Sequence, residues 1–469
     1  MCSSDLSISG TNIEPGKWNV TKTFTIENKS NETYKYNIVI QDLVNTFVTN
    51  GYLQYKITST NGGYNMTEFK DVPKSEPATD TILAYSASID VGVTQSYTVE
   101  FIYKNNESVD QSEDMGKTLN GKLFITEGTI DPAMYAGYEK GTLGYQIMGD
   151  NPKRSTRSNN NNGTNDFATP LTATTTGTLF TSKESITGIT DSPKEVYYYA
   201  GITTNNWVKF ANLYWRIIRT NHDGSIRLLY AGTSPDTTSG YIGTSAFNTI
   251  KYNPMYSGYK YGTTGSLENN RLNTNDSTIK AYVDNWYKNN LTAYTKYLSN
   301  DAVYCNDRTL ASGETYSTSR FYYASYERMQ NRQPTYNCTN ISDAFSVNNT
   351  SAKLDYPIGL MTIDELSYAG GVYSNFSVTT NAWYCTNANG ESITGRETTW
   401  SLSPEFFGDP GSVVWRWNGS SVPGSFGNSV VDSTSAVRPA ISLKSCIKYS
   451  TGNGTPETPY EIVETEGGC

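Results

Sequence analysis

Short stretches in which apolar and polar residues alternate recur along the first quarter of the chain, and no other feature constrains its fold as strongly. KWNVTKTFTIE, TYKYNIVI and SYTVEFIY are clear examples, and Asn, Gly, Ser and Pro residues stand between such stretches. Because side chains alternate between the two faces of a strand, each stretch predicts a strand with one covered face. Repeated at short spacing without a helical period, they predict a β-sandwich over residues 7–127.

Residues 196–448 mix strand and helix signals, which predicts a separate α+β domain. LYWRIIRT (213–220) and SIRLLY (225–230) carry large side chains on both faces. Strands of this kind are usually central in a sheet and covered on both sides. The segments TTWSLSP, GSVVWRWNGSS and SAVRPAISL, further along the chain, also resemble strands.

Two helices are predicted in this second domain. DSTIKAYVDNWYKNNL has a helical apolar period and begins with Asp276 or Ser277, either of which can cap it. In TIDELSYAGG, Thr362 and Glu365 have the spacing of a capping box, and Gly370 or Gly371 ends the helix.

The remaining segments are predicted to lack a core of their own. Residues 128–195 contain KRSTRSNNNNGTND, a polar low-complexity stretch that predicts a flexible linker. Residues 449–469 are predicted to form a polar tail.

The first six residues, MCSSDL, have two interpretations. Cys2 followed by small and acidic residues resembles the start of a mature lipoprotein. The same six residues are also the translation, from a GTG start codon, of GTGTGCTCTTCCGATCT, the end of a common sequencing adapter. We favour the second interpretation, under which residues 1–6 are an artefact and an export signal has been lost upstream.

Composition favours an exported protein. The chain of 469 residues is rich in tyrosine (37), low in charge (17%) and carries a formal net charge of −9. A negative net charge argues against nucleic-acid binding, which depends on neutralising phosphates. The sequence contains no apolar run long enough to cross a bilayer. We therefore expect an extracellular or cell-surface location.

Four cysteines fall within one region and suggest two disulfides. None of them lies in a CxxC pair, so a zinc or redox motif is not indicated. In an exported protein we expect the bridges Cys305–Cys338 and Cys385–Cys446, with one bridge and free thiols as the alternative.

The single histidine limits the possible chemistry. His222 lies in Asn-His-Asp-Gly between two predicted strands, a composition typical of a hairpin turn. We expect it at an exposed tip, which excludes histidine-dependent triads and histidine-rich zinc sites.

Two acidic pairs are candidates for acid–base chemistry. Asp364 and Glu365 occupy a first helical turn, where capping explains them. Glu405 and Asp409 flank two phenylalanines, and either a raised-pKa acid in an apolar pocket or a solvated loop fits, the loop being preferred. We predict no catalytic residue, no metal and no cofactor.

Paired tryptophans suggest a binding surface. Trp415 and Trp417 are two residues apart and share a face of a predicted strand, with Arg416 on the opposite face. Exposed aromatic residues among small polar ones are typical of recognition surfaces, and burial in the core is the alternative. The predicted ligand-binding set is completed by Trp400 and Asn418.

Two resemblances to known families accompany these patterns. IEPGKWNVTKTFTIENKSNETYKYNIVI, SIDVGVTQSYTVEFIYKN and MGKTLNGKLFITEG resemble the camelysin-like family of exported Firmicute proteins, which includes biofilm-matrix fibre subunits. That resemblance implies an immunoglobulin-like sandwich at the surface. Peptidase activity is not carried over, because the chain has no HExxH motif.

The second domain resembles an exported gut-Firmicute domain of unknown function. The resemblance rests on YWRIIR, T-x-DE-x-x-x-AGG, W-x-x-SP and VRPAISL. The last motif is also similar to the C-type-lectin and formylglycine-generating-enzyme superfold. Calcium is not expected, because no EPN loop accompanies Asn418, and a copper site at Cys385 and Cys446 is less expected than a disulfide.

Together these features predict an all-β immunoglobulin-like sandwich followed by an α+β, C-type-lectin-like domain. The predicted function is a secreted or surface protein that binds a glycan or protein ligand and is not an enzyme. The alternative is a structural fibre or matrix subunit that self-associates through the sandwich by strand addition. An enzyme of unknown reaction is third.

Overall fold

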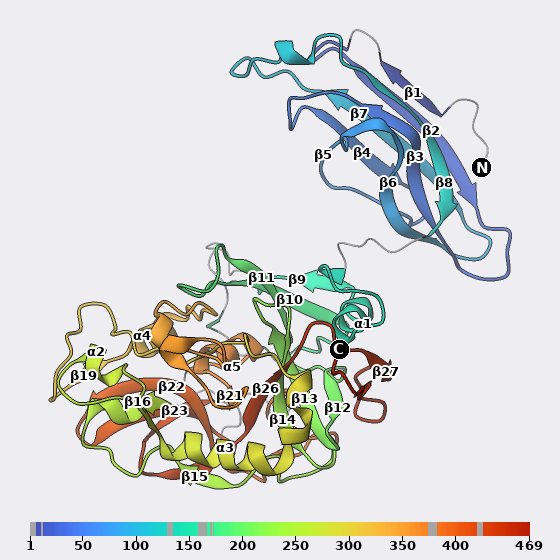
Figure 1. Ribbon diagram of the computed structural model, residues 1–469. Helices are drawn as coiled ribbons and strands as arrows, with labels where there is room; N and C mark the ends of the chain where they lie inside the picture. Colours follow the sequence, from blue (N-terminus) through green and yellow to red (C-terminus); the bar gives the residue numbers. More distant parts are fainter. Residues whose placement is uncertain are drawn as a thin grey trace. The chain divides into compact units, whose positions relative to one another are not determined.

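The computed structural model divides into two compact units, residues 1–134 and 135–469, each described here by itself (Figure 1). The structure describes residues 6–10, 13–128, 135–157, 167, 168, 171, 173–373, 382–419 and 425–469.

The first unit consists of two antiparallel four-stranded sheets that share one core. One sheet has the order β1 (Ser7–Gly10), β8 (Leu119–Glu127), β3 (Tyr34–Asn45), β6 (Ser75–Ile89). The other has the order β2 (Asn19–Glu27), β7 (Thr94–Tyr103), β4 (Leu53–Ser59), β5 (Lys70–Asp71).

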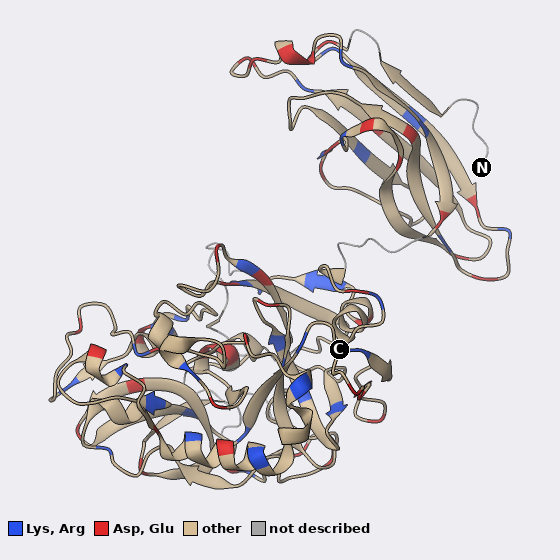
Figure 2. Ribbon diagram, in the orientation of Figure 1, with Lys and Arg blue, Asp and Glu red and all other residues tan. Residues whose placement is uncertain are grey.

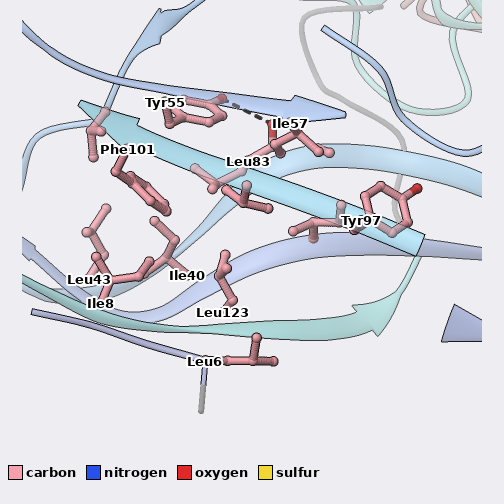
Figure 3. Packing of buried hydrophobic residues seen from close by; sticks show 14 of the residues in the cluster. Leu6, Ile8, Ile40, Leu43, Tyr55, Ile57, Leu83, Tyr97, Phe101 and Leu123 are labelled. Atoms are coloured by element: carbon pink, nitrogen blue, oxygen red, sulfur yellow. Dashed lines mark hydrogen bonds between the residues drawn. The ribbon is translucent and has the colours of Figure 1, made fainter. Parts of the chain in front are cut away.

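Alternation along the strands fills the space between these sheets. Strand β7 alternates exposed and buried side chains along most of its length. Ile40 and Leu123 from one sheet meet Ile57 and Phe101 from the other in a single apolar cluster (Figure 3). The alternating stretches seen in the sequence therefore do form strands, as predicted; β7 has one covered face, whereas residues 36–40 of β3 are all buried.

Strand β6 was not predicted. Its sequence, SEPATDTILAYSASI, contains a proline and does not alternate strictly. Its pairing with β3 is interrupted by register shifts, so a uniform period of two is absent from this strand.

The second unit is built around a ten-stranded sheet. Its main path runs β21 (Ile358–Leu360), β26 (Pro439–Leu443), β14 (Ile226–Gly232), β13 (Leu213–Thr220), β11 (Lys194–Tyr198), β10 (Thr178–Glu184), β9 (Lys153–Ser155). Strands β12 (Trp207–Phe210), β27 (Tyr449–Thr451) and β28 (Tyr460–Ile462) extend it beside β13. All residues of β14 are buried, which confirms the prediction of a strand covered on both sides.

A six-stranded sheet and several helices complete the unit. The sheet has the order β15 (Thr244–Ala246), β25 (Thr434–Ala436), β22 (Thr399–Gly408), β23 (Gly411–Trp417), β24 (Phe426–Val430), and β19 (Phe321–Tyr322) pairs with β22. The helices that bear on function are α3 (Thr278–Asn290), α4 (Ala324–Asn331) and α5 (Ile363–Ala369) (Figure 1).

The predicted helix caps are present. Ser277 caps α3 by accepting a hydrogen bond from the backbone N–H of Lys280. At α5, Thr362 and Glu365 form the reciprocal capping box, and Gly370 ends the helix with a φ of 118°. Local sequence was sufficient here because each cap is satisfied within four residues.

The domain boundaries drawn from sequence need correction. Helix α1 (Leu143–Asp150) and strands β9 and β10 lie within residues 128–195, the predicted linker, and β11 begins there. Residues 158–166, which include its asparagine run, lie outside the described residues. The second unit therefore starts near residue 135, not 196.

The predicted boundaries at both ends of the chain also need correction. The predicted tail 449–469 supplies β27 and β28, and β28 pairs in parallel with β12. Leu6 is buried in the core of the first unit, and its carbonyl accepts a hydrogen bond from Leu123. It therefore belongs with the sandwich, whereas residues 1–5 lie outside the described residues.

Candidate functional site

An open cleft of about 450 Å3 lies beside β10 in the second unit. Aromatic rings and small polar groups line it together, which is the usual composition of a small-ligand site. The rings are those of Phe167, Tyr198 and Tyr368. The polar and charged lining side chains are Thr156, Arg157, Thr181, Ser182, Lys183, Thr335 and Asn337.

Segments from distant parts of the sequence build the cleft. Strands β10 and β11 bring Ser182 and Tyr198, and α5 brings Tyr368. Ser182 donates a hydrogen bond to the hydroxyl of Tyr368 over 3.1 Å, and that hydroxyl donates to the carbonyl of Pro334 over 3.1 Å. These bonds fix one ring of the wall against the strand.

The aromatic rings support each other. Tyr368 stacks on Tyr336 with centroids 4.0 Å apart, and its edge meets Tyr198 at 5.0 Å and Phe167 at 5.1 Å. Arg157 lies 4.3 Å from the centroid of Phe167 and donates to the carbonyl of Ser367. These contacts position the rings of the cleft wall relative to one another.

The disulfide Cys305–Cys338 holds the segment 335–338 at the rim of the cleft. Beside it, the backbone N–H of Cys338 donates to the carbonyl of Ser185, and Asn337 accepts from the N–H of Ser185. Thr335 donates its N–H to Asp364 over 3.1 Å. The predicted bridge is therefore present, and it fixes part of the cleft wall.

Buried ion pairs lie behind this wall. Arg219 on β13 donates to Glu184 over 2.8 Å and to Glu365 over 2.9 Å, and Arg227 on β14 donates to Glu365 over 2.6 Å. All four side chains are no more than 3% exposed. In Figure 2 the acidic first turn of α5 is red within the unit.

Three further groups continue this ionic cluster. Arg328 on α4 pairs with Asp364 over 2.8 Å and with Asp307 over 2.7 Å. The space left between the two groups is about 20 Å3, room for roughly one water molecule. It is too small for a ligand, so these charges support the cleft wall and do not form a separate site.

The electrostatic consequence of this arrangement is that the acids stay ionised. Burial opposes ionisation of Glu184, but Arg219 and His222 outweigh it and hold its pKa well below the usual range. Burial likewise opposes ionisation of Glu365, and Arg227 and Arg219 keep its pKa low. Paired charges of this kind stabilise only as a set, because removing one leaves its partner buried and uncompensated.

The charge lining the cleft is positive. Arg157 and Lys183 contribute to its wall, whereas the described residues that line it include no aspartate or glutamate. Glu184 follows Lys183 on β10 and points to the opposite face, into the ion-pair cluster. A ligand in the cleft would therefore meet cationic groups, in a chain whose net charge is −9.

The binding surface predicted from tryptophans is wrong. Trp400, Trp415 and Trp417 are at most 2% exposed and belong to the core around the six-stranded sheet. Arg416 is half-buried on the other face of β23, and Asn418 is half-buried just after that strand. The spacing of Trp415 and Trp417 correctly predicted that they share a face of the strand, but that face packs into the core.

One predicted disulfide is also wrong. Cys446 pairs with Cys469, and Cys385 is a buried free thiol. Burial raises the pKa of Cys385 to about 12, so this thiol is unreactive at neutral pH. Two disulfides indicate a protein that folds in an oxidising environment.

His222 lies in the predicted turn but not at an exposed tip. The turn closes where Gly224 donates its N–H to the carbonyl of Asn221. The His222 side chain is 7% exposed, and its Nδ1 lies 3.4 Å from a carboxylate oxygen of Glu184. The residue therefore joins the buried ion-pair cluster instead of facing solvent.

The prediction that Glu405 lies in a solvated loop is also wrong. It is a strand residue of β22, 2% exposed, and burial raises its pKa to about 7. This is the raised-pKa acid in an apolar setting that the sequence left open. Asp409 is exposed at the turn after β22.

One group of three aspartates has the geometry of a cation site but already holds a cation. Oxygens of Asp276, Asp284 and Asp355 lie within 4.8 Å of one another. The ammonium of Lys280 reaches them over 3.4, 2.5 and 2.8 Å. Figure 2 shows the acidic and basic residues alternating along α3. The lysine takes the place that a metal ion would need.

Sequence reasoning missed the cleft because most of its lining residues come from the predicted linker. The segment TLFTSKE (178–184), whose threonines and phenylalanine favour a strand, was the signal that could have revealed β10. No local pattern places it beside α5.

Comparison of the chain with protein-family models, curated proteins and solved structures gives no match. Within the described residues, no helix combines the length and the hydropathy required to span a bilayer.

Proposed function

We propose that this chain is an extracellular binding protein whose second unit holds a carbohydrate in the cleft beside β10. The observation that carries the proposal is the cleft itself, with three aromatic rings, hydroxyl and amide groups, and two cationic side chains. Aromatic faces contact the apolar side of a sugar ring, and hydroxyl and amide groups satisfy its hydroxyls.

The size of the cleft favours a glycan over a protein surface. A volume of about 450 Å3 lies in the range of small-ligand sites. A stable protein–protein contact needs roughly 800 Å2 from each partner, which one concave cleft of this size does not provide. The cationic groups Arg157 and Lys183 favour sugars that carry carboxylate or sulfate groups.

In this proposal the first unit is an immunoglobulin-like spacer and the second has a lectin-like fold. The two sheets with one shared core support the former, and the mixed β-rich unit that follows supports the latter. The proposal assigns binding, not catalysis, to the cleft.

Self-assembly through the first unit is the second candidate function. Among the described residues, β2 pairs only with β7, so its outer edge is available to another strand. An edge strand of nine residues can accept a strand from a second copy. A fibre subunit should form long assemblies as concentration rises without ligand, which size-exclusion chromatography and electron microscopy would detect.

A glycan array with the full chain tests the first proposal. Ser182→Phe places a ring in the cleft and should reduce binding at least tenfold. Ser450→Phe is the matched control, because Ser450 is an exposed strand residue outside the cleft and its change should leave binding unaltered. Equal binding by both variants, or binding of no glycan, would exclude the cleft as the site.

A further inference from the structure

Glu405 lies at an irregularity of β22 and is not among the described residues that line the cleft. Pro404 pairs with Val414 and Phe406 pairs with Val413, so Glu405 is an additional residue opposite β23. A bulge of this kind turns a side chain away from the regular alternation and is common beside binding sites.

The carboxyl group of Glu405 is buried with unused hydrogen-bonding capacity. The residue is 2% exposed, and among the described residues no partner reaches its Oε2. Burial raises its pKa to about 7, and a contact with Asn428 opposes that rise. A buried polar atom without a partner is costly, so its retention calls for an explanation.

Half-exposed tyrosines lie next to this carboxyl group. Tyr322 stacks on Tyr326 with centroids 4.1 Å apart and meets Phe406 at 5.6 Å. Tyr373 meets Trp415 edge-on at 5.0 Å. The backbone N–H of Tyr323 donates to the carbonyl of Glu405 over 2.9 Å, which places β19 and the start of α4 against this residue. After burial, the negative charge of Glu405 is a further cause that raises the pKa of both Tyr326 and Tyr373.

The charged groups on the neighbouring elements are engaged elsewhere. Arg320, before β19, lies over the ring of Tyr322 and donates to its hydroxyl. On α4, Arg328 pairs with Asp364 and Asp307, and Glu327 accepts the N–H of Ser312.

On β23, Arg416 donates toward Ser435. Within the described residues none of these cations forms an ion pair with Glu405. The carboxyl group therefore has no counter-ion among the described residues.

We propose that Glu405 with Tyr322, Tyr326 and Tyr373 forms a second binding site, for an alkylammonium group such as a lysine side chain of a partner protein. Tyrosine faces attract ammonium groups, and a carboxylate at the base of the site supplies the counter-charge and accepts the N–H groups. The proposal is independent of the carbohydrate cleft, which has the opposite charge preference.

Calorimetric titration of the full chain with n-butylammonium tests the proposal, with n-butanol as the uncharged probe of equal shape. We expect millimolar binding of n-butylammonium at pH 8.5 and none of n-butanol. Alkylammonium groups stay charged at this pH. At pH 5.5 the Glu405 carboxyl is protonated, and affinity should fall about twentyfold or more.

Two variants separate this site from general attraction to an acidic protein. Glu405→Gln keeps the shape and should abolish both the binding and its pH dependence. Tyr326→Phe keeps the ring and should bind within about threefold of the wild type. Melting curves at pH 5.5, where Glu405 is already uncharged, check that Glu405→Gln is folded.

Either of two results would overturn the proposal. One is the absence of saturable n-butylammonium binding at pH 8.5. The other is undiminished binding by a folded Glu405→Gln variant. Loss of glycan binding in the cleft variant has no bearing on this result, so the two proposals fail separately.

Discussion

Glu365 accepts hydrogen bonds from Arg219 and Arg227 through one carboxylate oxygen while its other oxygen accepts the N–H of Thr362 at the start of α5. One side chain thus caps a helix and links that helix to two strands of the ten-stranded sheet. Because α5 also carries Tyr368, the geometry of the cleft depends on this buried carboxylate.

The first prediction concerns this linkage. Arg219→Met leaves Glu184 with His222 alone and removes one of two arginines from Glu365, so the unfolding free energy should fall by about 3–5 kcal/mol. Chemical denaturation at pH 7 measures it. The exposed Arg396→Met should change stability by no more than about 0.5 kcal/mol. A loss at Arg219 as small as the control's would show that the pairs are not coupled to folding.

The second prediction concerns pH. Glu405 has a folded pKa of about 7, above that of an exposed glutamate, so the folded state binds the proton more tightly than the unfolded state. Its contribution to stability is therefore largest at acid pH and is lost as the pH rises through 7. Glu405→Gln should gain about 3 kcal/mol relative to the wild type between pH 5 and pH 8.5. Urea denaturation at several pH values measures the difference, and parallel profiles would contradict it.

The third prediction concerns the tryptophans of β23. Trp415 is fully buried and its Nε1 donates to Ser325 over 3.2 Å. Trp415→Ala should cost about 3–5 kcal/mol of stability by leaving a cavity. Thermal melting measures the loss, and the half-buried Arg416→Ala on the same strand is the comparison. An unchanged melting temperature for Trp415→Ala would show that Trp415 is not a core residue.

The fourth prediction concerns the cysteines. A non-reduced digest should contain the linked pairs Cys305–Cys338 and Cys446–Cys469, with Cys385 free. Cys385 should react with iodoacetamide only after denaturation, because it is buried and its pKa is raised to about 12. Recovery of a Cys385–Cys446 peptide by mass spectrometry would contradict the structure.

The fifth prediction concerns the start of the second unit. A chain that begins at Tyr135 retains β10 and β11 and should melt cooperatively. A chain that begins at 196 lacks β9, β10 and most of the cleft wall, so β11 is truncated and loses its partner β10, and the protein should be insoluble or molten. Near-ultraviolet circular dichroism distinguishes the two chains. Equal spectra would show that residues 135–195 are not needed for the fold, as the predicted linker implies.

Sequence patterns predicted what is decided within a few residues. The capping box of Thr362 and Glu365 and the strands of the first unit follow from local spacing. Cys446 could pair with Cys385 or with Cys469, and spacing along the chain does not decide between them. Trp415 and Trp417 share a face, but only the fold determines that this face is inside.

The cleft lay beyond sequence reasoning for the same reason. Ser182 and Tyr368 are in contact although 186 positions separate them. The sequence around Ser182 and around Tyr368 contains no pattern that predicts this contact.

The place of β26 between β14 and β21 has a kinetic consequence. This strand, Pro439–Leu443, pairs with Ile226–Leu229 on one side and with Ile358–Leu360 on the other. The three strands cannot form a continuous sheet until more than two hundred intervening residues have been brought together. Contacts of such long sequence separation slow folding, because the entropy of closing the loop is lost before any pairing energy is gained. During that interval β14 and β21 expose unpaired edges, the period in which an unfinished chain is most open to aggregation.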